Sequence, residues 1–342
     1  MKRRVRISIL ALCAALCGCG ANGEFPALRG PYLGQTPPGA EPALFAPGIV
    51  STGLYERDLA VTPDGGEIFY GLVFGRHAVI MHTRLAGGRW TEPEVAPFSR
   101  DLAFLYLEPA LSPDGARVYF LSTKAPPGEE PKPGWTNQNI WMSERAADGS
   151  WGEARIVGPA VSTADEEYFP SVTRDGTIYF ARRPDGSRRD RIYRARLEGG
   201  SYAATEPLPA AVNGEWTIFN AFIAPDESYL VACVAGKDPE ITKGLAHYYV
   251  FFRDGDDRWS EGVHLGEKIN PPLAQAMSPS ITPDGRYFFF ASTMANEIDA
   301  GAPGMLTLSG IRTFYGAPKN GLFDIYWVDA SVIHDLRKDS TD

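Results

Sequence analysis

Apolar and polar residues alternate over short runs along most of the chain, and one such pattern recurs five times. In each copy an alternating run meets a tight turn, and a run rich in aromatic and β-branched residues follows. The copies are LAVTPDGGEIFYG from Leu59, PALSPDGARVYFLS from Pro109, PSVTRDGTIYFAR from Pro170, AFIAPDESYLVAC from Ala221 and SPSITPDGRYFFF from Ser278. Because successive side chains of a strand point to opposite faces, each copy predicts a β-hairpin with a buried face.

The turn inside each copy is chemically specified. Proline presets φ, aspartate bonds its own backbone and glycine permits positive φ. The turn aspartates are separated by 50, 61, 51 and 58 residues, at positions Asp64, Asp114, Asp175, Asp226 and Asp284. Self-similarity of this kind indicates a repeat architecture. Arg174 replaces proline in the third turn and Glu227 replaces glycine in the fourth, so we expect these two turns to be weaker.

A second hairpin follows most copies, and an aromatic residue marks its turn. These residues are Trp90, Trp151, Tyr202 and Trp259. Four strands in a unit of roughly 40 to 50 residues are typical of a β-propeller blade. An amphipathic helix is suggested only near residues 332–337. We therefore predict an all-β fold, a β-propeller of five four-stranded blades.

The way the ring closes is predicted by the two ends of the repeat region. After the fifth copy, FDIYWVDAS leaves too little chain for an outer strand, whereas residues 43–53 (ALFAPGIVSTG) precede the first copy. This leading segment matches ARIVGPAVSTA, which follows the second copy as an outer strand. We predict that residues 45–52 complete the last blade, which removes the exposed sheet edges. Six blades are the alternative, although residues 20–42 are too rich in proline and glycine to supply one.

The Ser/Thr-Pro-Asp-Gly turns, each followed by an aromatic strand, resemble the propeller repeats of the TolB-like family over residues 43–330. The resemblance implies a propeller that binds a partner. In TolB the propeller follows a separate α/β domain and binds a lipoprotein at its channel mouth. This sequence has no room for such a domain, so the resemblance implies binding by the propeller without implying the role of TolB.

Residues 1–18 have the features of a secretory signal, with four basic residues near the start and an apolar stretch from Val5 to Leu16. The stretch is short for a membrane span. Leu16-Cys17-Gly18-Cys19 resembles a bacterial lipobox, which implies that Cys19 is lipidated. Modification of Cys17 and an ordinary cleaved signal are the alternatives. We predict a lipoprotein signal peptide at 1–18, a tether at 19–42, the propeller at 43–330 and a C-terminal tail at 331–342.

Cleavage before Cys19 changes the charge and the cysteine count. It removes four basic residues, so the net charge becomes 29 − 42 = −13. An exported acidic chain has no electrostatic reason to bind nucleic acid. Cys233 is then the one unmodified cysteine, which we expect to be buried. We predict a monomer at the periplasmic face of the bacterial envelope, held at the outer membrane through lipid alone.

The loops expected between second and third strands are long, and they share one end of the propeller with the links between blades. We call this end the long-loop face; its loops are 124–139, 182–190, 235–246 and 294–321. Function tends to reside on such loops, so we place the binding site there. Residues six and seven positions before each turn aspartate are predicted to surround the channel mouth. The ligand-binding candidates among them are Arg57, Asp58, Glu108, Tyr168, Phe169 and Asn220.

Two hypotheses for the function follow. The first is a non-catalytic lipoprotein that binds an envelope protein segment or a glycan. The second is a glycoside hydrolase in which Asp58 acts as general base and Glu108 as general acid, which needs carboxyls about 5–10 Å apart and one raised pKa. The five histidines are scattered and Gly-x-Ser-x-Gly is absent from the sequence, so we predict neither a metal site nor a cofactor.

Overall fold

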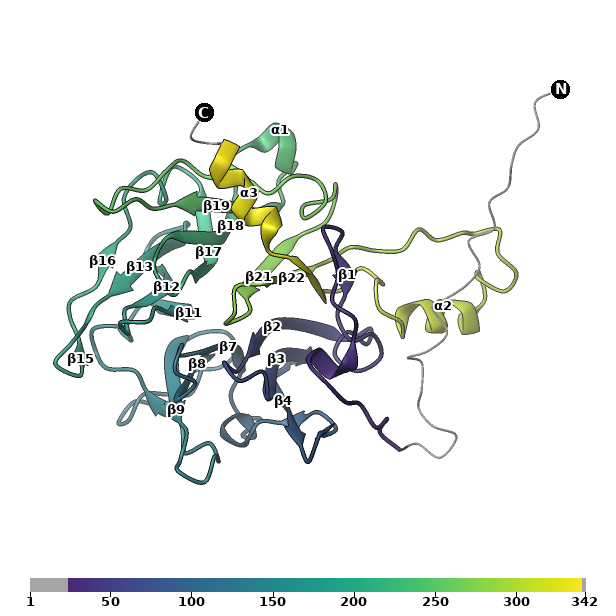
Figure 1. The fold of residues 1–342 in the computed structure, drawn as a ribbon, viewed down its shortest axis with the longest axis horizontal. Helices are drawn as coiled ribbons and strands as arrows, with labels where there is room; N and C mark the ends of the chain where they lie inside the picture. The colour runs from purple at the N-terminus through teal and green to yellow at the C-terminus, as the bar shows by residue number, and fades with distance from the viewer. Residues whose placement is uncertain (1–23, 340–342) are drawn as a thin grey trace.

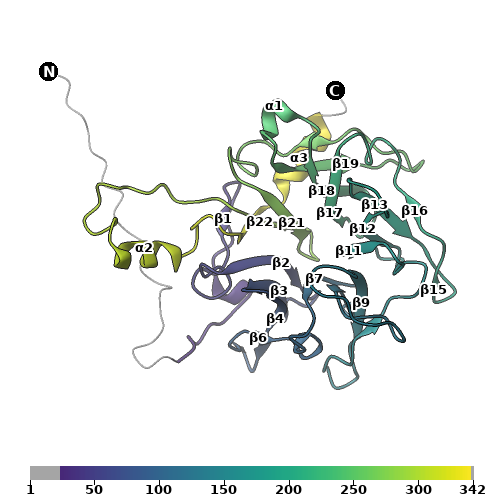
Figure 2. The ribbon, with the colours of Figure 1, turned by 180° about the vertical axis from the view of Figure 1, so that it is seen from behind.

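The computed structural model describes residues 24–339, which form a five-bladed β-propeller around a central channel (Figures 1 and 2). The expected signal peptide (1–18) and Cys19 lie outside these residues. Each blade is an antiparallel sheet of four strands that are ordered from the channel outward. The predicted all-β fold with five four-stranded blades is therefore confirmed.

The first three blades use consecutive stretches of the chain. Blade 1 consists of β2 (Tyr55–Val61), β3 (Glu67–Phe74), β4 (His77–Ala86) and β6 (Glu94–Val95), with β5 (Arg89–Trp90) as a short hairpin on β4. Blade 2 consists of β7 (Tyr106–Leu111), β8 (Arg117–Ser122), β9 (Asn139–Glu144) and β10 (Arg155–Ile156). Blade 3 consists of β11 (Glu166–Val172), β12 (Ile178–Arg183), β13 (Arg191–Ala195) and β16 (Glu206–Pro207), beside the hairpin β14 (Leu197–Glu198) and β15 (Ser201–Tyr202).

The last two blades differ in where their outer strand comes from. Blade 4 consists of β17 (Thr217–Ile223), β18 (Tyr229–Ala235), β19 (Ala246–Phe252) and β20 (Val263–His264). Blade 5 consists of β21 (Ala276–Ile281), β22 (Tyr287–Ser292), β23 (Asp324–Asp329) and β1 (Ala43–Leu44). The outermost strand of blade 5 thus comes from the start of the described chain, which closes the ring.

The closing strand is shorter than predicted. Ala43 pairs with Trp327 and Leu44 with Tyr326, and the Phe45 N–H donates to the Ile325 carbonyl at 2.8 Å. Beyond Phe45 the chain turns, and the Ser51 hydroxyl donates to the same Ile325 carbonyl at 3.1 Å. The leading segment does complete blade 5, but its ladder lies at residues 43 and 44 rather than along residues 45–52.

The turns between the innermost and second strands follow the predicted chemistry. Asp64 Oδ1 accepts hydrogen bonds from Thr62 Oγ1 at 2.5 Å and from the Gly66 N–H at 2.9 Å. The third turn keeps this pattern despite Arg174. In the fourth turn, the Ser228 hydroxyl bonds the turn aspartate, while Glu227 adopts a φ of 60° in the position of glycine. The Glu227 carboxylate contacts a tyrosine hydroxyl and an arginine of neighbouring strands, which helps to hold this strained residue.

Neighbouring blades pack face to face through apolar side chains, and the aromatic residues of the second hairpins contribute to this packing. Trp90, Trp151 and Trp259 are all buried in such clusters between blades. Cys233 is fully buried, as predicted, in the cluster between blades 4 and 5. The apolar core of the propeller therefore lies between the blades, and the innermost strands line the channel.

Helices are few and lie at the periphery. They are α1 (Pro239–Thr242), α2 (Leu308–Tyr315) and α3 (Ser331–Asp339), with 3-10 turns at Tyr32–Gly34 and Pro97–Ser99. Helix α3 contains the stretch 332–337 that the sequence suggested, whereas α2 was not predicted. Within residues 24–339, none of the helices has the length and apolar character needed to cross a membrane.

Candidate functional site

Each innermost strand carries a β-bulge halfway along its length. The bulged residues all have positive φ: Asp58 (60°), Glu108 (62°), Phe169 (51°), Asn220 (45°) and Ser278 (62°). In three blades the next residue is a proline, which cannot donate an N–H to the ladder. A bulge re-aims the side chain at its position, and bulges are frequent beside functional sites. The five bulges therefore define one level of the channel, which we call the bulge ring.

The bulge ring is connected by hydrogen bonds from blade to blade. The Ser278 hydroxyl of blade 5 donates to Asp58 Oδ1 in blade 1. The Glu108 N–H of blade 2 donates to Asp58 Oδ2 at 3.2 Å, and the Phe169 N–H of blade 3 donates to Glu108 Oε2 at 2.7 Å. Four of the five blades are thus joined inside the channel through two carboxylates.

Arg57 completes this network from within blade 1. Its Nε donates to Asp58 Oδ1 at 2.8 Å, and its Nη2 donates to Glu108 Oε1 at 2.7 Å. All three side chains are buried. Each of the four oxygens of Asp58 and Glu108 consequently accepts a hydrogen bond from the protein itself.

Burial and the two acidic charges determine the protonation of this cluster. Burial, with a smaller contribution from the neighbouring Asp58, raises the pKa of Glu108 to about 7, although Arg57 acts in the opposite direction. Burial disfavours the charged form of Arg57, but Asp58 and Glu108 outweigh this and hold its pKa above the usual value. One guanidinium therefore faces two carboxyls, and the raised pKa of Glu108 reflects the cost of burying its charge.

The remaining candidate residues are also buried rather than displayed at a rim. Tyr168 is buried, and this burial, together with Asp190, raises the pKa of its hydroxyl well above the usual value. The Phe169 ring packs in the core cluster that spans blades 1 to 4. Asn220 is 2% exposed, and its Nδ2 has no hydrogen-bond partner among the described residues. The sequence located the right level of the channel, but the structure places it inside the molecule.

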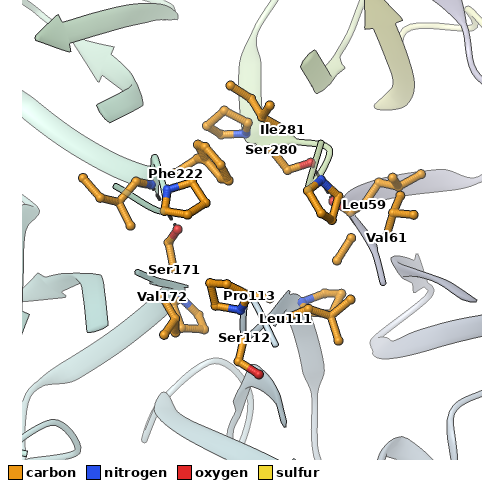
Figure 3. Close-up of a pocket in the computed structure, with 18 of the residues that line it drawn as sticks. Leu59, Val61, Leu111, Ser112, Pro113, Ser171, Val172, Phe222, Ser280 and Ile281 are labelled. Atoms are coloured by element: carbon orange, nitrogen blue, oxygen red, sulfur yellow. Dashed lines mark hydrogen bonds between the residues drawn. The ribbon is translucent and has the colours of Figure 1, made fainter. Parts of the chain in front are cut away.

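A cavity of about 190 Å³ occupies the half of the channel between the bulge ring and the Pro-Asp-Gly turns (Figure 3). We call it the channel cavity. Its floor includes Asp58, Glu108, Phe169 and Ser278, and its wall is formed by the residues that follow them in each innermost strand. At its outer edge are the turn residues Pro63, Pro113, Arg174, Pro225 and Pro283. These edge residues are exposed or half-buried, whereas the floor is buried, so the cavity opens at the turn end.

The wall of the channel cavity is mostly apolar. Figure 3 shows Leu59, Val61, Leu111, Val172, Phe222 and Ile281 arranged around the opening. The three serines of the wall already have partners. Ser112 Oγ donates to Asp114 Oδ1 at 2.5 Å, Ser171 Oγ accepts from the Ile223 N–H at 3.0 Å, and Ser280 Oγ donates to the Leu59 carbonyl at 2.6 Å. The side chains that line the cavity are therefore mainly apolar, and the serine hydroxyls among them are already engaged.

The long loops lie at the opposite end of the channel. Residues 123–138, 184–190, 236–245 and 293–323 join second to third strands, as the sequence predicted. On this side of the bulge ring, Arg57, Leu107 and Tyr168 are buried. The channel cavity is thus at the turn end, whereas the loop lengths in the sequence predicted a site at the long-loop face.

Proline at two recurring positions of the repeats is the sequence signal that could have located this cavity. A proline follows three of the bulge residues, and a second proline enters four of the five turns. Proline supplies an apolar ring and no N–H, and every innermost strand has a proline at one or both of these positions, which favours an apolar channel wall. Across residues 24–339, no group of three or more histidine, cysteine, aspartate or glutamate side chains is placed to hold a metal ion.

Fold and site together define the chain as a five-bladed β-propeller with a channel cavity. No protein-family profile matches the sequence, and no curated protein matches it. Among solved structures, it is similar to TolB from Acinetobacter baumannii, with 16% identity, a TM-score of 0.46, and coverage of 81% of this chain and 57% of that one. An α-L-arabinofuranosidase from Lactobacillus brevis gives 12% identity and a TM-score of 0.47, with 81% and 90% coverage.

A third similar structure is the nidogen/laminin complex, with 13% identity, a TM-score of 0.43, and coverage of 67% of this chain and 71% of that one. The chain spans little more than half of the TolB chain. Identities and TM-scores this low carry no information on ligand or activity.

Proposed function

We propose that the protein is a non-catalytic binding propeller of the bacterial cell envelope, and that a segment of an envelope protein enters its channel cavity. In this proposal the protein is a monomer at the periplasmic face of the outer membrane, where a lipid on Cys19 holds it. The observation that carries the proposal is a cavity lined mainly by apolar side chains, open at one end, above carboxylates whose oxygens all accept hydrogen bonds from the protein.

The size and lining of the cavity favour a protein side chain as the bound group. An apolar cavity of about 150 Å³ is large enough for a benzene ring, and the channel cavity measures about 190 Å³. One large apolar side chain would therefore fit. A glycan, the alternative ligand, needs hydrogen-bond partners for its hydroxyls, and all three serines of the wall are already engaged.

The occupied carboxylates disfavour the glycoside hydrolase hypothesis. A general acid must donate its proton to the leaving oxygen, and a base or nucleophile must reach water or the sugar. In Asp58 and Glu108 every oxygen already accepts a bond from Arg57, Ser278 or a backbone N–H. The raised pKa of Glu108 alone does not supply a free proton donor. We expect no turnover of an oligosaccharide panel, and loss of a measured turnover in the Asp58→Asn, Glu108→Gln double variant would revive the hypothesis.

A blocked cavity tests the binding proposal. Ala110 lines the cavity, and Ala110→Phe would fill part of it. Ala164→Phe places the same side chain at an exposed position in the link between blades 2 and 3 and serves as the control. Purified protein cross-linked in envelope extract should capture a specific protein, identified by mass spectrometry, that Ala110→Phe loses and Ala164→Phe keeps. Equal capture by both variants would contradict a site in the channel, and retention of a purified envelope glycan instead would assign the site to sugar.

Lipidation is tested separately. The mass of the mature N-terminal peptide should show acylation at Cys19, and Cys19→Ser should release the protein from the membrane fraction. An unmodified N-terminus would remove the anchor from the proposal without affecting the channel cavity.

A further inference from the structure

The longest connection of the propeller is an arm at the seam between blades 5 and 1. It joins β22 to β23 through residues 293–323 and contains α2. The arm is fixed at its base, where the Asn296 N–H donates to the Lys319 carbonyl at 2.8 Å and Asn320 Nδ2 donates to the Gly53 carbonyl at 2.9 Å. Beyond this base it projects away from the disc (Figures 1 and 2). These hydrogen bonds fix the place on the propeller from which the arm extends.

The outer part of the arm displays apolar side chains that the protein does not cover. Leu306, Leu308, Ile311 and Tyr315 are 70%, 65%, 52% and 62% exposed, and no residue of α2 is buried. The Thr307 side chain caps the helix by accepting from the Gly310 N–H. Positions 308, 311 and 315 are spaced by three and four residues, so their side chains share one face of the helix.

This face has the character of a helix that lies in a membrane interface. Such helices place leucine and aromatic side chains in the boundary between headgroups and acyl chains, and carry basic residues alongside. Tyr315 is suited to this boundary because its ring is apolar and its hydroxyl is polar. Arg312 lies one turn after Leu308 and is exposed beside the apolar face.

The position of the proposed anchor indicates which surface the arm would meet. Residues 28–30 are fastened to blade 1, because the Trp90 N–H donates to the Leu28 carbonyl at 3.0 Å and Trp90 Nε1 donates to the Gly30 carbonyl at 2.7 Å. Only five peptide steps separate Cys19 from Glu24, a reach of at most roughly 18 Å. The first described residues and the arm lie on the same side of the disc (Figures 1 and 2). A lipid on Cys19 would therefore bring this side of the propeller against the bilayer.

We propose that the apolar face of α2, with Leu306, inserts into the interface of the membrane that carries the lipid anchor. The proposal rests on the lipidation of Cys19 put forward above. Lipid and arm are then two attachment points on one side of the disc, and they hold the propeller edge-on to the bilayer. This orientation leaves both ends of the channel, including the mouth of the channel cavity, accessible from the periplasm.

A fluorescent probe on the arm tests the proposal in the full, lipidated chain. Leu306→Cys is labelled with an environment-sensitive dye, and the buried Cys233 should not react in the folded protein. Ser150→Cys, an exposed position in the second hairpin of blade 2, carries the same dye as the control. In vesicles of phosphatidylethanolamine and phosphatidylglycerol, the Leu306 probe should shift to shorter wavelength and be quenched by bromine-labelled lipid, whereas the Ser150 probe should do neither. Adding Ile311→Glu should reduce both effects at Leu306.

The outcomes separate this proposal from the one it rests on. If the protein is in the vesicle fraction but the two probes behave alike, the arm does not meet the membrane and is available to a protein partner. Lipidation would stand, and the membrane role of α2 would be wrong. If the protein is absent from the vesicle fraction, the lipid anchor is wrong and the proposal is overturned with it.

Discussion

Arg57 and Glu108 form an ion pair across the first two blades, with 2.7 Å between Nη2 and Oε1, in the interior of the channel. Their side chains are 9% and 5% exposed. Burying two charges costs free energy that their attraction recovers only when hydrogen bonds satisfy the remaining polar atoms. Here the Phe169 N–H donates to the second oxygen of Glu108, and Arg57 Nε donates to Asp58, so the cluster joins blades while it closes the cavity floor.

Removing one partner of this cluster should be strongly destabilising. Glu108→Ala would leave Arg57 buried with one carboxylate and the Phe169 N–H without an acceptor, so we expect a loss of about 3–5 kcal/mol in the free energy of unfolding. Urea denaturation at pH 7 measures it. Glu94→Ala breaks an exposed pair with Arg100 and should cost no more than about 1 kcal/mol. Similar midpoints for the two variants would show that the buried cluster does not stabilise the ring.

The sequence predicted where this site lies along each innermost strand, but it did not predict the direction of the side chains, which the β-bulges set. The repeats and their turn aspartates located the channel level correctly, because register counted from a fixed turn is regular in every blade. The direction of the side chains could not be predicted from the sequence. It depends on a positive φ at Asp58 and Glu108, and a residue other than glycine gives no signal of such a conformation. Two carboxylates expected at an open rim are therefore buried in a network with Arg57.

The ring closure and the long loop at 294–321 were predictable from the repeats, whereas the helix inside that loop was not. The leading segment was recognised because it resembles an outer strand elsewhere in the chain, and it does pair with β23. Helix α2 has no counterpart in the other repeats, contains Gly310 and is flanked by Gly304 and Gly316. Glycine lowers helix propensity, so local composition argued against a helix there. The Thr307 cap and the apolar spacing of three and four residues were the signals available.

The closure should depend on Phe45. Its ring is fully buried and lies 5.0 Å from the Phe289 ring and 5.3 Å from the Trp327 ring, measured between centroids. We expect Phe45→Ala to cost about 3–5 kcal/mol, because it leaves a cavity between the first and last blades. Phe74→Ala, at a 37% exposed position of β3, is the matched control. Thermal unfolding followed by circular dichroism compares them, and an effect of Phe45→Ala no larger than the control would contradict a stabilising closure.

Ionisation of the buried Glu56 carboxyl should lower the free energy of unfolding as the pH rises. Burial raises the pKa of this carboxyl from 4.5 to about 7, in spite of hydrogen bonds from Thr52. Between these two values the folded protein holds a proton that the unfolded chain has released, so the contribution to stability decreases as pH rises, by up to about 1.4 kcal/mol per pH unit. Glu56→Gln keeps an oxygen for Thr52 and cannot ionise. We expect the variant to match the parent near pH 4 and to exceed it in unfolding free energy at pH 8; a constant difference would contradict the raised pKa.

A pair of histidines in blade 4 should give stability the opposite dependence on pH, so that their contribution is lost as the pH falls. His247 Nδ1 and His264 Nε2 are 2.9 Å apart, so the two rings share one hydrogen bond and cannot both be protonated without repulsion. Burial lowers the pKa of both below 6.5, and the neighbouring His264 lowers that of His247 further. The unfolded chain therefore binds protons that the folded protein excludes, and the stability that this pair contributes above pH 6.5 is lost as pH falls.

Imidazole titration by NMR tests this pair directly. Both midpoints should lie below 6.5, and His264→Asn should move the His247 midpoint upward, because it removes the repulsion but leaves the ring largely buried. Urea denaturation at pH 5.5 and 7.5 should show a smaller loss at the lower pH for the variant than for the parent. If the His247 midpoint does not move, burial alone sets its pKa, and the contact between the two rings has no part in the acid sensitivity of blade 4.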